Sequence, residues 1–475
     1  MTLEYILNLI LGVLAGAGVL IPVIDLYLKK GKTKYIAVFA LLSSLTLSLM
    51  LAYQVKKEGP YINGPLVIDF YGAFLSIIAC IGALFVLLAS IGDVDEWETC
   101  STFNSLTLIA LLGIIILIFT RDLVLLMVTW ALVSVASYVI AGLKKDYASV
   151  EGSSKYALMG IASSSIMLYG IALTYGVIGT TIIDINNVDK TASGPIILVG
   201  ISLLIASLSY KLGVVPFHGW LPDVYGGVDP LLVSYLAGVV KIAGVVALLR
   251  IVYPFSQILS SKWFDLIAIL SFATMTYGNI IALTQKNIQR MMAYSSLAQS
   301  GYIMAAFAVY LGNTNAVMAL EGVALHVTTY VLAKIAIFVG LAYLAGKGVE
   351  LTLDGVRGLG RKMPITSFGI AIAVLNLMGF PPLIGFWSKF IYIFLAVFNV
   401  SPLLAILAIA NSAISVGYYS LVLKKLYFPK KTLELEITEE KYGWKPIIII
   451  FASALTIILG LGPALKIAPY LIPNF

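Results

Sequence analysis

Residues 209–223 decide the class of this protein, and they read Ser209-Tyr-Lys-Leu-Gly-Val-Val-Pro-Phe-His-Gly-Trp-Leu-Pro-Asp223. Lys211 stands in an apolar run, and Pro216 follows five residues later. A proline inside a helix removes a backbone hydrogen bond and opens the turn. At membrane depth such a break is tolerated only where protein buries it or where it lines a wet cavity. We therefore expect a broken membrane helix with a lysine beside the break.

A second stretch repeats this combination in the other half of the chain. Residues 379–389 read Gly379-Phe-Pro-Pro-Leu-Ile-Gly-Phe-Trp-Ser-Lys389, with Lys389 seven residues after Pro382. Interrupted segments at corresponding places in two halves indicate inverted repeats with a transport site near the bilayer midplane. The alternative is a pair of kinks that only improve packing.

The composition places most of the chain in lipid. Of the 475 residues, 60% are hydrophobic and only 11% are charged, whereas a soluble domain carries about 25% charged residues. Too few charges remain to cover a water-facing surface, so we expect an all-α polytopic membrane protein without strands.

The sequence predicts no redox cofactor and no metal site in this chain. Cys80 and Cys100 are its two cysteines, too few for an iron–sulfur cluster or a disulfide framework. The two histidines, His218 and His326, lie on different predicted segments, and no phosphate-binding or dinucleotide motif is present. Any redox centre is expected in a partner subunit.

A membrane crossing needs roughly 20 apolar residues, and this length predicts about fourteen spans. They cover residues 4–28, 33–54, 68–91, 101–119, 121–142, 153–178, 196–216, 222–252, 262–284, 290–311, 316–345, 364–398, 402–428 and 446–470. The first is not read as a cleaved signal peptide, because Glu4 rather than a basic stretch precedes it. We divide the chain into an N-terminal segment (1–100), two repeats (101–252 and 262–428), and a charged loop with a last helix (429–475).

Basic residues in the loops and at the ends of the predicted spans gather on alternate loops. The richer set comprises loops within 29–34, 144–155, 286–290, 347–362 and 424–445, and the poorer set holds Lys56, Lys57, Arg121, Lys190, Arg250, Lys262 and Lys466. Positive loops stay in the cytoplasm, so both termini are expected on the outer side of the plasma membrane.

Four lysines remain, each flanked by apolar residues in the interior of a predicted span: Lys211, Lys241, Lys334 and Lys389. A charge at the centre of a membrane helix costs about 2.5–3.5 kcal/mol on insertion scales. Lys241 or Lys389 could singly extend its ammonium to the interface, but four such residues on four spans favour a function. Unlike arginine, lysine can lose its proton in a protein, so lysines joined by water predict a proton path.

The same stretches resemble the antiporter-like subunits of a superfamily that covers respiratory complex I, Mrp-type cation/proton antiporters and archaeal membrane-bound hydrogenases. The resemblance rests on the motif from Lys211 to Asp223 and on four further stretches. These are Ala282-Leu-Thr-Gln with Arg290-Met-Met-Ala-Tyr-Ser-Ser-Leu-Ala-Gln-Ser-Gly-Tyr302, then His326 with Lys334 and Phe338, then Gly379 to Lys389, and Glu151 with Lys155-Tyr156.

The resemblance implies fourteen helices, with helices 4–8 and 9–13 as inverted repeats and helices 7 and 12 broken. It implies that Lys211 is the central proton-accepting lysine, that Lys241 and Lys334 link the path, and that Lys389 lies on the exit side. His326 resembles a linking histidine, while His218 and Asp223 are expected at the mouth of broken helix 7. The pair His326 and Lys334 looks closer to Mrp D-type and hydrogenase-type subunits than to the N-type of complex I.

One position departs from the family pattern. The family usually has glutamate directly after tryptophan on helix 5, whereas this chain reads Val128-Thr-Trp-Ala131. Without that carboxylate Lys211 is expected to carry its proton less often than in its relatives, since an opposite charge stabilises the ammonium. Either the coupling differs, or another chain provides the charge.

The leading hypothesis is a subunit that translocates protons or sodium ions within a respiratory complex, driven by redox chemistry in other subunits. Its expected partners are another antiporter-like subunit and small hydrophobic subunits, and no nucleic acid. The alternatives are an Mrp-type antiporter subunit without a redox partner, or a scaffold subunit that has lost transport at Ala131. A self-contained transporter for an organic substrate fits least.

Overall fold

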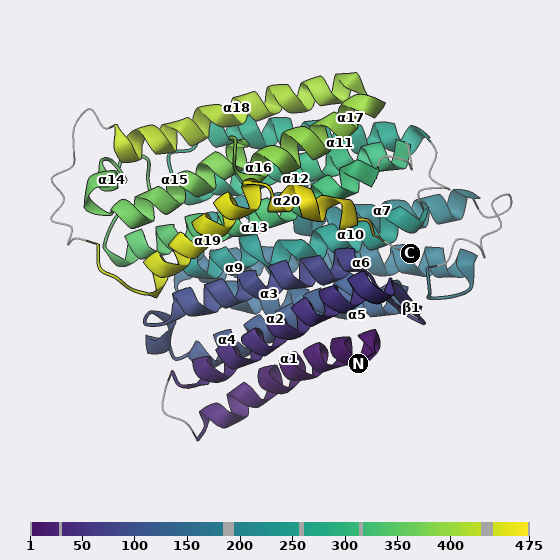
Figure 1. Ribbon diagram of the computed structural model, residues 1–475, viewed down its shortest axis with the longest axis horizontal. Coiled ribbons are helices and arrows are strands. Elements are labelled where there is room, and N and C mark those ends of the chain that lie inside the picture. The colour runs from purple at the N-terminus through teal and green to yellow at the C-terminus, as the bar shows by residue number, and fades with distance from the viewer. Residues whose placement is uncertain are drawn as a thin grey trace.

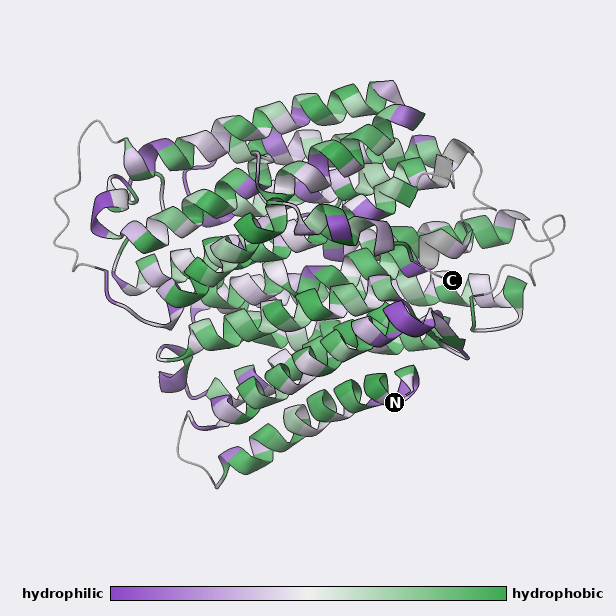
Figure 2. Ribbon diagram, viewed as in Figure 1, coloured by the Kyte–Doolittle hydropathy of each residue, from purple (hydrophilic) through white to green (hydrophobic). Residues whose placement is uncertain are grey.

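The fold is a layered bundle of helices that run roughly side by side, as the computed structural model shows (Figure 1). The structure describes residues 2–27, 31–183, 194–255, 261–312, 317–428 and 440–473. Hydrophobic residues dominate the helices, and hydrophilic ones are more frequent at their ends (Figure 2). The chain is thus a multi-pass membrane protein.

The first half contains the helices α1 (Leu3–Asp25), α2 (Thr33–Glu58), α3 (Phe70–Ser90), α4 (Cys100–Phe119), α5 (Leu123–Gly142), α6 (Tyr147–Ile178), α7 (Gly194–Leu212), α8 (Leu221–Gly227), α9 (Pro230–Gly238) and α10 (Val240–Phe255), with a short 3-10 turn η1 (Val94–Glu96). Asp122 and Asp146 begin α5 and α6, because their carboxylates accept from the amides of Leu125 (2.7 Å) and Ser149 (2.8 Å). Asp122 therefore fixes the boundary between the closely spaced spans 101–119 and 121–142.

The second half contains α11 (Ser261–Thr284), α12 (Ile288–Gly312), α13 (Val317–Gly346), α14 (Leu359–Lys362), α15 (Pro364–Met378), α16 (Ile384–Phe386), the π-helix η3 (Trp387–Phe394), α17 (Leu395–Val400), α18 (Pro402–Tyr427), α19 (Trp444–Gly460), α20 (Pro463–Ile467) and the 3-10 turn η4 (Ala468–Tyr470). The N- and C-terminal ends lie toward the same end of the bundle (Figure 1).

Among the described residues, eleven helices are long and apolar enough to cross a membrane, and the bent pair at 444–470 would be a twelfth. The predicted spans 290–311 and 364–398 correspond to α12 and to the shorter helices α15–α17, which are not among the eleven. The count of fourteen therefore stays a prediction, as do the two repeats.

The absence of strands was a wrong expectation. Strands β1 (Tyr61–Asn63) and β2 (Leu66–Ile68) pair antiparallel after α2, with Ile62 opposite Val67. Three-residue strands are too short to show a periodic pattern, and Gly64, at φ 51°, allows the tight turn between them.

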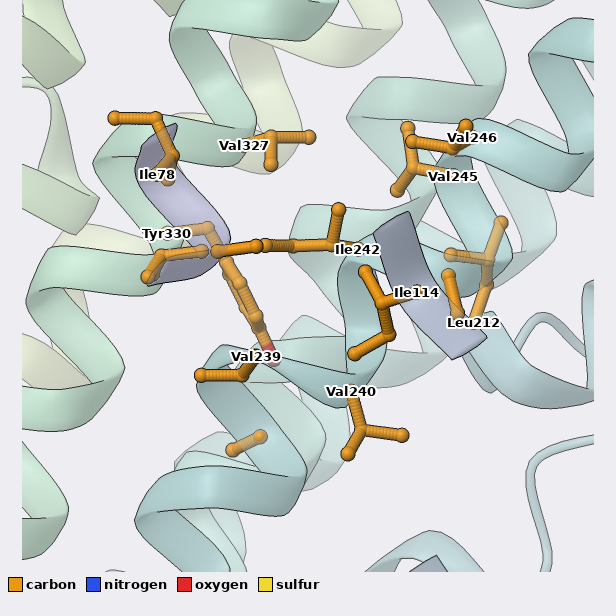
Figure 3. Packing of buried hydrophobic residues seen from close by; sticks show 14 of the residues in the cluster. Ile78, Ile114, Leu212, Val239, Val240, Ile242, Val245, Val246, Val327 and Tyr330 are labelled. Atoms are coloured by element: carbon orange, nitrogen blue, oxygen red, sulfur yellow. The ribbon is translucent and has the colours of Figure 1, made fainter. Parts of the chain in front are cut away.

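Two central segments position the site. The span Pro230–Arg250 is 100% buried within the protein and the best window of α13 is 94% buried, against 33% for α1 and 39% for α18. Figure 3 shows how apolar side chains such as Ile78, Ile242 and Val327 pack around Tyr330 of α13. A charged or polar side chain on these segments faces protein rather than lipid.

Candidate functional site

The first predicted break is present directly after α7. The helix ends at Leu212, and Gly213 adopts φ 73°, a left-handed conformation that favours glycine. The freed carbonyl of Leu212 accepts from Ser300 Oγ at 2.7 Å, and the amide of Val215 donates to Thr274 Oγ1 at 3.1 Å. Hydroxyls of α12 and α11 thus satisfy the backbone of the broken helix, next to Pro216.

Lys211 lies at the end of α7 and is buried, with 2% of its surface exposed. Its Nζ donates to Ser134 Oγ at 3.2 Å and to Ser137 Oγ at 3.1 Å, both on α5. The rings of Tyr138 and Tyr156 have their centroids 5.4 Å and 5.2 Å from the same nitrogen. Neutral hydroxyls and aromatic faces surround this ammonium.

Ala131 is half-buried on α5, one turn before Ser134. In the described part of the chain, no carboxylate lies within the 4.0 Å of Lys211 Nζ that defines an ion pair. Among these residues, no other acid therefore replaces the carboxylate that is missing at position 131.

Lys241 follows on α10 and is also buried. Its Nζ donates to the carbonyl of Ser296 at 2.9 Å and to the Tyr330 hydroxyl at 3.3 Å. The same carbonyl accepts from Ser300 Oγ at 2.9 Å. Ser300 Oγ therefore contacts two carbonyls. One belongs to Leu212, the residue after Lys211, and the other is the Ser296 carbonyl that accepts from Lys241.

Lys334 lies on α13 and is completely buried. Its Nζ donates to the carbonyl of Met292 at 2.7 Å and to Ser295 Oγ at 3.1 Å. The Tyr330 ring lies between two lysines, with its centroid 4.7 Å from Lys241 Nζ and 5.5 Å from Lys334 Nζ.

His326, Tyr330 and Lys334 follow one another at four-residue spacing, so they share one face of α13. The His326 Nδ1 atom is 3.3 Å from Ser388 Oγ, which directly precedes Lys389 in the chain. The Nε2 atom is buried and has no hydrogen-bond partner among the described residues. This face leads from the central lysines toward the second break.

The second predicted break follows α15, where Gly379 adopts φ 85°. Asn376 Oδ1 accepts from the amide of Gly385 at 2.8 Å and thereby anchors the segment that contains Pro382. The chain then continues as the π-helix η3, a rare form that is frequent at functional sites.

Lys389 lies within η3 and is 1% exposed. Among the described residues its Nζ has no hydrogen-bond partner. The ring centroids of Tyr302 and Phe394 lie 4.3 Å and 6.0 Å away. All four lysines are thus enclosed in protein, and none reaches the interface as the alternative for Lys241 and Lys389 required.

The other predicted residues form a cluster at the protein surface. Lys155 Nζ lies 2.8 Å from both Glu151 and Asp223, and Arg290 Nη2 lies 3.1 Å from Asp223. His218 is half-buried, with its ring 4.7 Å from that of Tyr277. The structure does not join this cluster or His218 to the lysine row through a hydrogen bond between described residues.

The side chains that accept hydrogen bonds from the lysines were not predicted from the sequence. Ser134, Ser137, Ser295 and Tyr330 stand out by no pattern of their own, because serine and tyrosine are common in membrane helices and serine often bonds to its own backbone. Arg250 was also misplaced, because it was counted as a loop residue. Arg250 lies inside α10, is 1% exposed, and pairs with the buried Asp69.

Fold and site together define a multi-pass membrane protein with two broken helices and a row of buried lysines. Residues 120–415 match the family described as NADH:quinone oxidoreductase/Mrp antiporter, TM. The chain belongs to this family.

Curated relatives cover nearly the whole chain. It is 32% identical over 455 residues to F(420)H(2) dehydrogenase subunit N of Methanosarcina mazei, a match that spans 92% of this chain and 91% of the relative. It is also 32% identical over 445 residues to NADH-quinone oxidoreductase subunit N of Heliobacterium modesticaldum, spanning 91% of each. These relatives are N subunits, so they give no support to the expected D-type or hydrogenase-type assignment.

Solved structures share the fold. A chain of respiratory complex I from Thermus thermophilus superposes with a TM-score of 0.82 at 29% identity and covers 97% of this chain and 98% of that one. A chain of the archaeal membrane-bound sulfane sulfur reductase gives a TM-score of 0.87 at 23% identity, covering 98% of this chain and 97% of its own.

Proposed function

We propose that this chain is an antiporter-like subunit of a multi-subunit respiratory membrane complex and translocates protons or sodium ions while other subunits carry out the redox chemistry. The N-subunit relatives, which are similar along nearly their whole length, support membership in such a complex. Partners would include other membrane subunits, another antiporter-like subunit among them.

The observation that carries the proposal is the row of four buried lysines on four separate elements, α7, α10, α13 and η3. Hydroxyls and carbonyls lie between them. Ser300 contacts acceptors beside Lys211 and Lys241, and Tyr330 contacts Lys241 and Lys334. Buried ionisable groups are costly in a membrane protein and mark ion or proton pathways.

The spacing of the row suits stepwise transfer. Two ammonium groups around one Tyr330 ring repel each other, so a proton on Lys241 disfavours a proton on Lys334. A proton that arrives at one lysine would therefore help to move the proton of the next. His326 would extend the path from α13 toward Lys389 through Ser388.

The arrangement of the chain in the membrane is part of the proposal. Residues 101–252 and 262–428 would form two inverted repeats, and each contains one of the breaks. Both termini would face outward across the plasma membrane, as the distribution of basic loops favours.

The experiment replaces Lys211 and Lys389 singly by alanine in the assembled complex, reconstituted into vesicles. We expect redox turnover to continue while ion uptake per turnover is lost. The matched control is Lys466→Ala, since Lys466 is exposed near the end of the chain. Normal uptake in both variants would refute the proposal.

One observation favours a second candidate, a scaffold subunit: Lys211 has no carboxylate partner among the described residues. The same vesicles separate the two. A scaffold predicts that Lys211→Ala retains pumping, whereas deletion of the chain dissolves the complex. Purification in mild detergent would also identify the co-eluting subunits, and redox subunits among them would exclude a stand-alone Mrp-type antiporter.

A further inference from the structure

Two serines of α5 both accept a hydrogen bond from Lys211. Ser134 and Ser137 are three residues apart and present both hydroxyls to one ammonium, at 3.2 Å and 3.1 Å. Both serines are buried, at 2% and 0% exposure. Two buried hydroxyls of the same helix therefore accept hydrogen bonds from one ammonium.

The hydrogen bonds of Ser137 extend this site toward α6. Its hydroxyl can donate to the carbonyl of Ser134 at 2.8 Å or to the Tyr156 hydroxyl at 3.4 Å. The carbonyl of Tyr156 in turn accepts from the Tyr210 hydroxyl at 2.6 Å, one residue before Lys211. The serines therefore belong to a network of neutral groups that fixes where the ammonium lies.

A pocket of about 420 Å³ that is open to the surface lies where α5 ends and α6 begins. It touches Tyr138, a neighbour of this network. Its lining includes Tyr138, Gly142, Ser153 and Ser154. The Tyr138 ring, at the inner end of this set along α5, is 5.4 Å from Lys211 Nζ. A cavity of this size with polar partners can hold several water molecules.

We propose that Ser134 and Ser137 are the functional partner of Lys211: a neutral pair of hydroxyls that holds its ammonium where the chain has alanine at position 131. This inference rests on the proposed function and names the positioning residues of its first step. The hydroxyls supply acceptors without a counter-charge, so the proton on Lys211 is held less tightly than in an ion pair and is released more readily.

Position 131 provides the means to test this. Residue 131 lies three positions before Ser134, one turn along the same side of α5, and Ser134 Oγ is already 3.2 Å from Lys211 Nζ. A glutamate at 131 would therefore be within reach of the ammonium. Among the described residues, the titratable side chains whose rings lie within 6 Å of Lys211 Nζ are Tyr138 on α5 and Tyr156 on α6.

The experiment measures ion uptake against pH in vesicles that contain the complete complex. The variants are the double substitution Ser134→Ala with Ser137→Ala, the same pair with Ala131→Glu, and the control Ser165→Ala. Ser165 is an exposed serine of α6 that bonds to its own helix, at the Ile161 carbonyl. Redox turnover and subunit content are measured in parallel.

We expect the double variant to lose uptake at neutral pH and to regain it about two to four pH units lower, because two hydrogen bonds are removed and each hydrogen bond to a charged group contributes about one to two units. Ala131→Glu should restore uptake at neutral pH, and Ser165→Ala should behave as the parent. An unchanged pH profile in the double variant would overturn the inference. So would a loss at every pH that Ala131→Glu does not restore, since that result assigns the serines a structural role. Normal uptake in both Lys211→Ala and Lys389→Ala would instead overturn the proposed function itself.

Discussion

Removal of one partner from the buried ion pair between Asp69 and Arg250 should destabilise this protein strongly. The two side chains are 0% and 1% exposed and are joined by two hydrogen bonds of 3.0 Å and 3.1 Å. Arg250 Nε also donates to the carbonyl of Ile118 at 2.8 Å. The pair thus connects the start of α3 with the ends of α4 and α10.

The substitution Arg250→Leu leaves the Asp69 carboxylate buried without its counter-charge. Breaking a buried pair in this way costs about 3–5 kcal/mol, which is roughly two to three and a half orders of magnitude in the folded-to-unfolded ratio. Part of this cost is recoverable. Asp69 also caps α3 by accepting from the amide of Gly72 at 2.7 Å, and asparagine caps about as well as aspartate.

We therefore expect the double variant Asp69→Asn with Arg250→Leu to be more stable than Arg250→Leu alone, since no charge is then buried. The assay is equilibrium unfolding of the full chain in mixed detergent micelles, followed by tryptophan fluorescence. Lys57→Leu, at an exposed position, serves as the control and should change stability by less than about 0.5 kcal/mol. The reasoning fails if Arg250→Leu costs under about 1 kcal/mol, the value of an exposed pair, or if the costs of the two substitutions add.

Two further predictions concern the second break and the centre of the row. Gly385→Ala should lower stability by about 1–3 kcal/mol, because a Cβ there would lie 1.9 Å from the Asn376 carbonyl oxygen; Gly12→Ala, which meets nothing within 4 Å, is the control, and equal unfolding midpoints would contradict the prediction. Tyr330→Phe removes the hydroxyl that accepts from Lys241 at 3.3 Å but keeps the ring, so ion uptake per redox turnover should fall while assembly persists, and unchanged uptake would show that the hydroxyl has no part in transfer.

The lysines and the breaks could be predicted from the sequence because each is a residue that its local sequence context disfavours. A lysine within an apolar run and a proline within a helix are both costly, and a local pattern reveals that cost. The receiving serines could not be predicted, because their bonds to Lys211 join residues 77 and 74 positions apart. Asp69 and Arg250 are separated by 181 residues, and each lies near the end of an apolar stretch, where no local pattern indicates that it is buried.

The four lysines differ in the hydrogen-bond acceptors that surround their ammonium groups. Lys211 donates to two hydroxyls, whereas Lys241 and Lys334 each donate to one carbonyl and one hydroxyl. Lys389 has aromatic rings but no hydrogen-bond acceptor among the described residues. A buried ammonium without acceptors is costly, so the charged form of Lys389 depends on water that reaches it. Water at the second break would then determine when Lys389 keeps its proton and when it releases it.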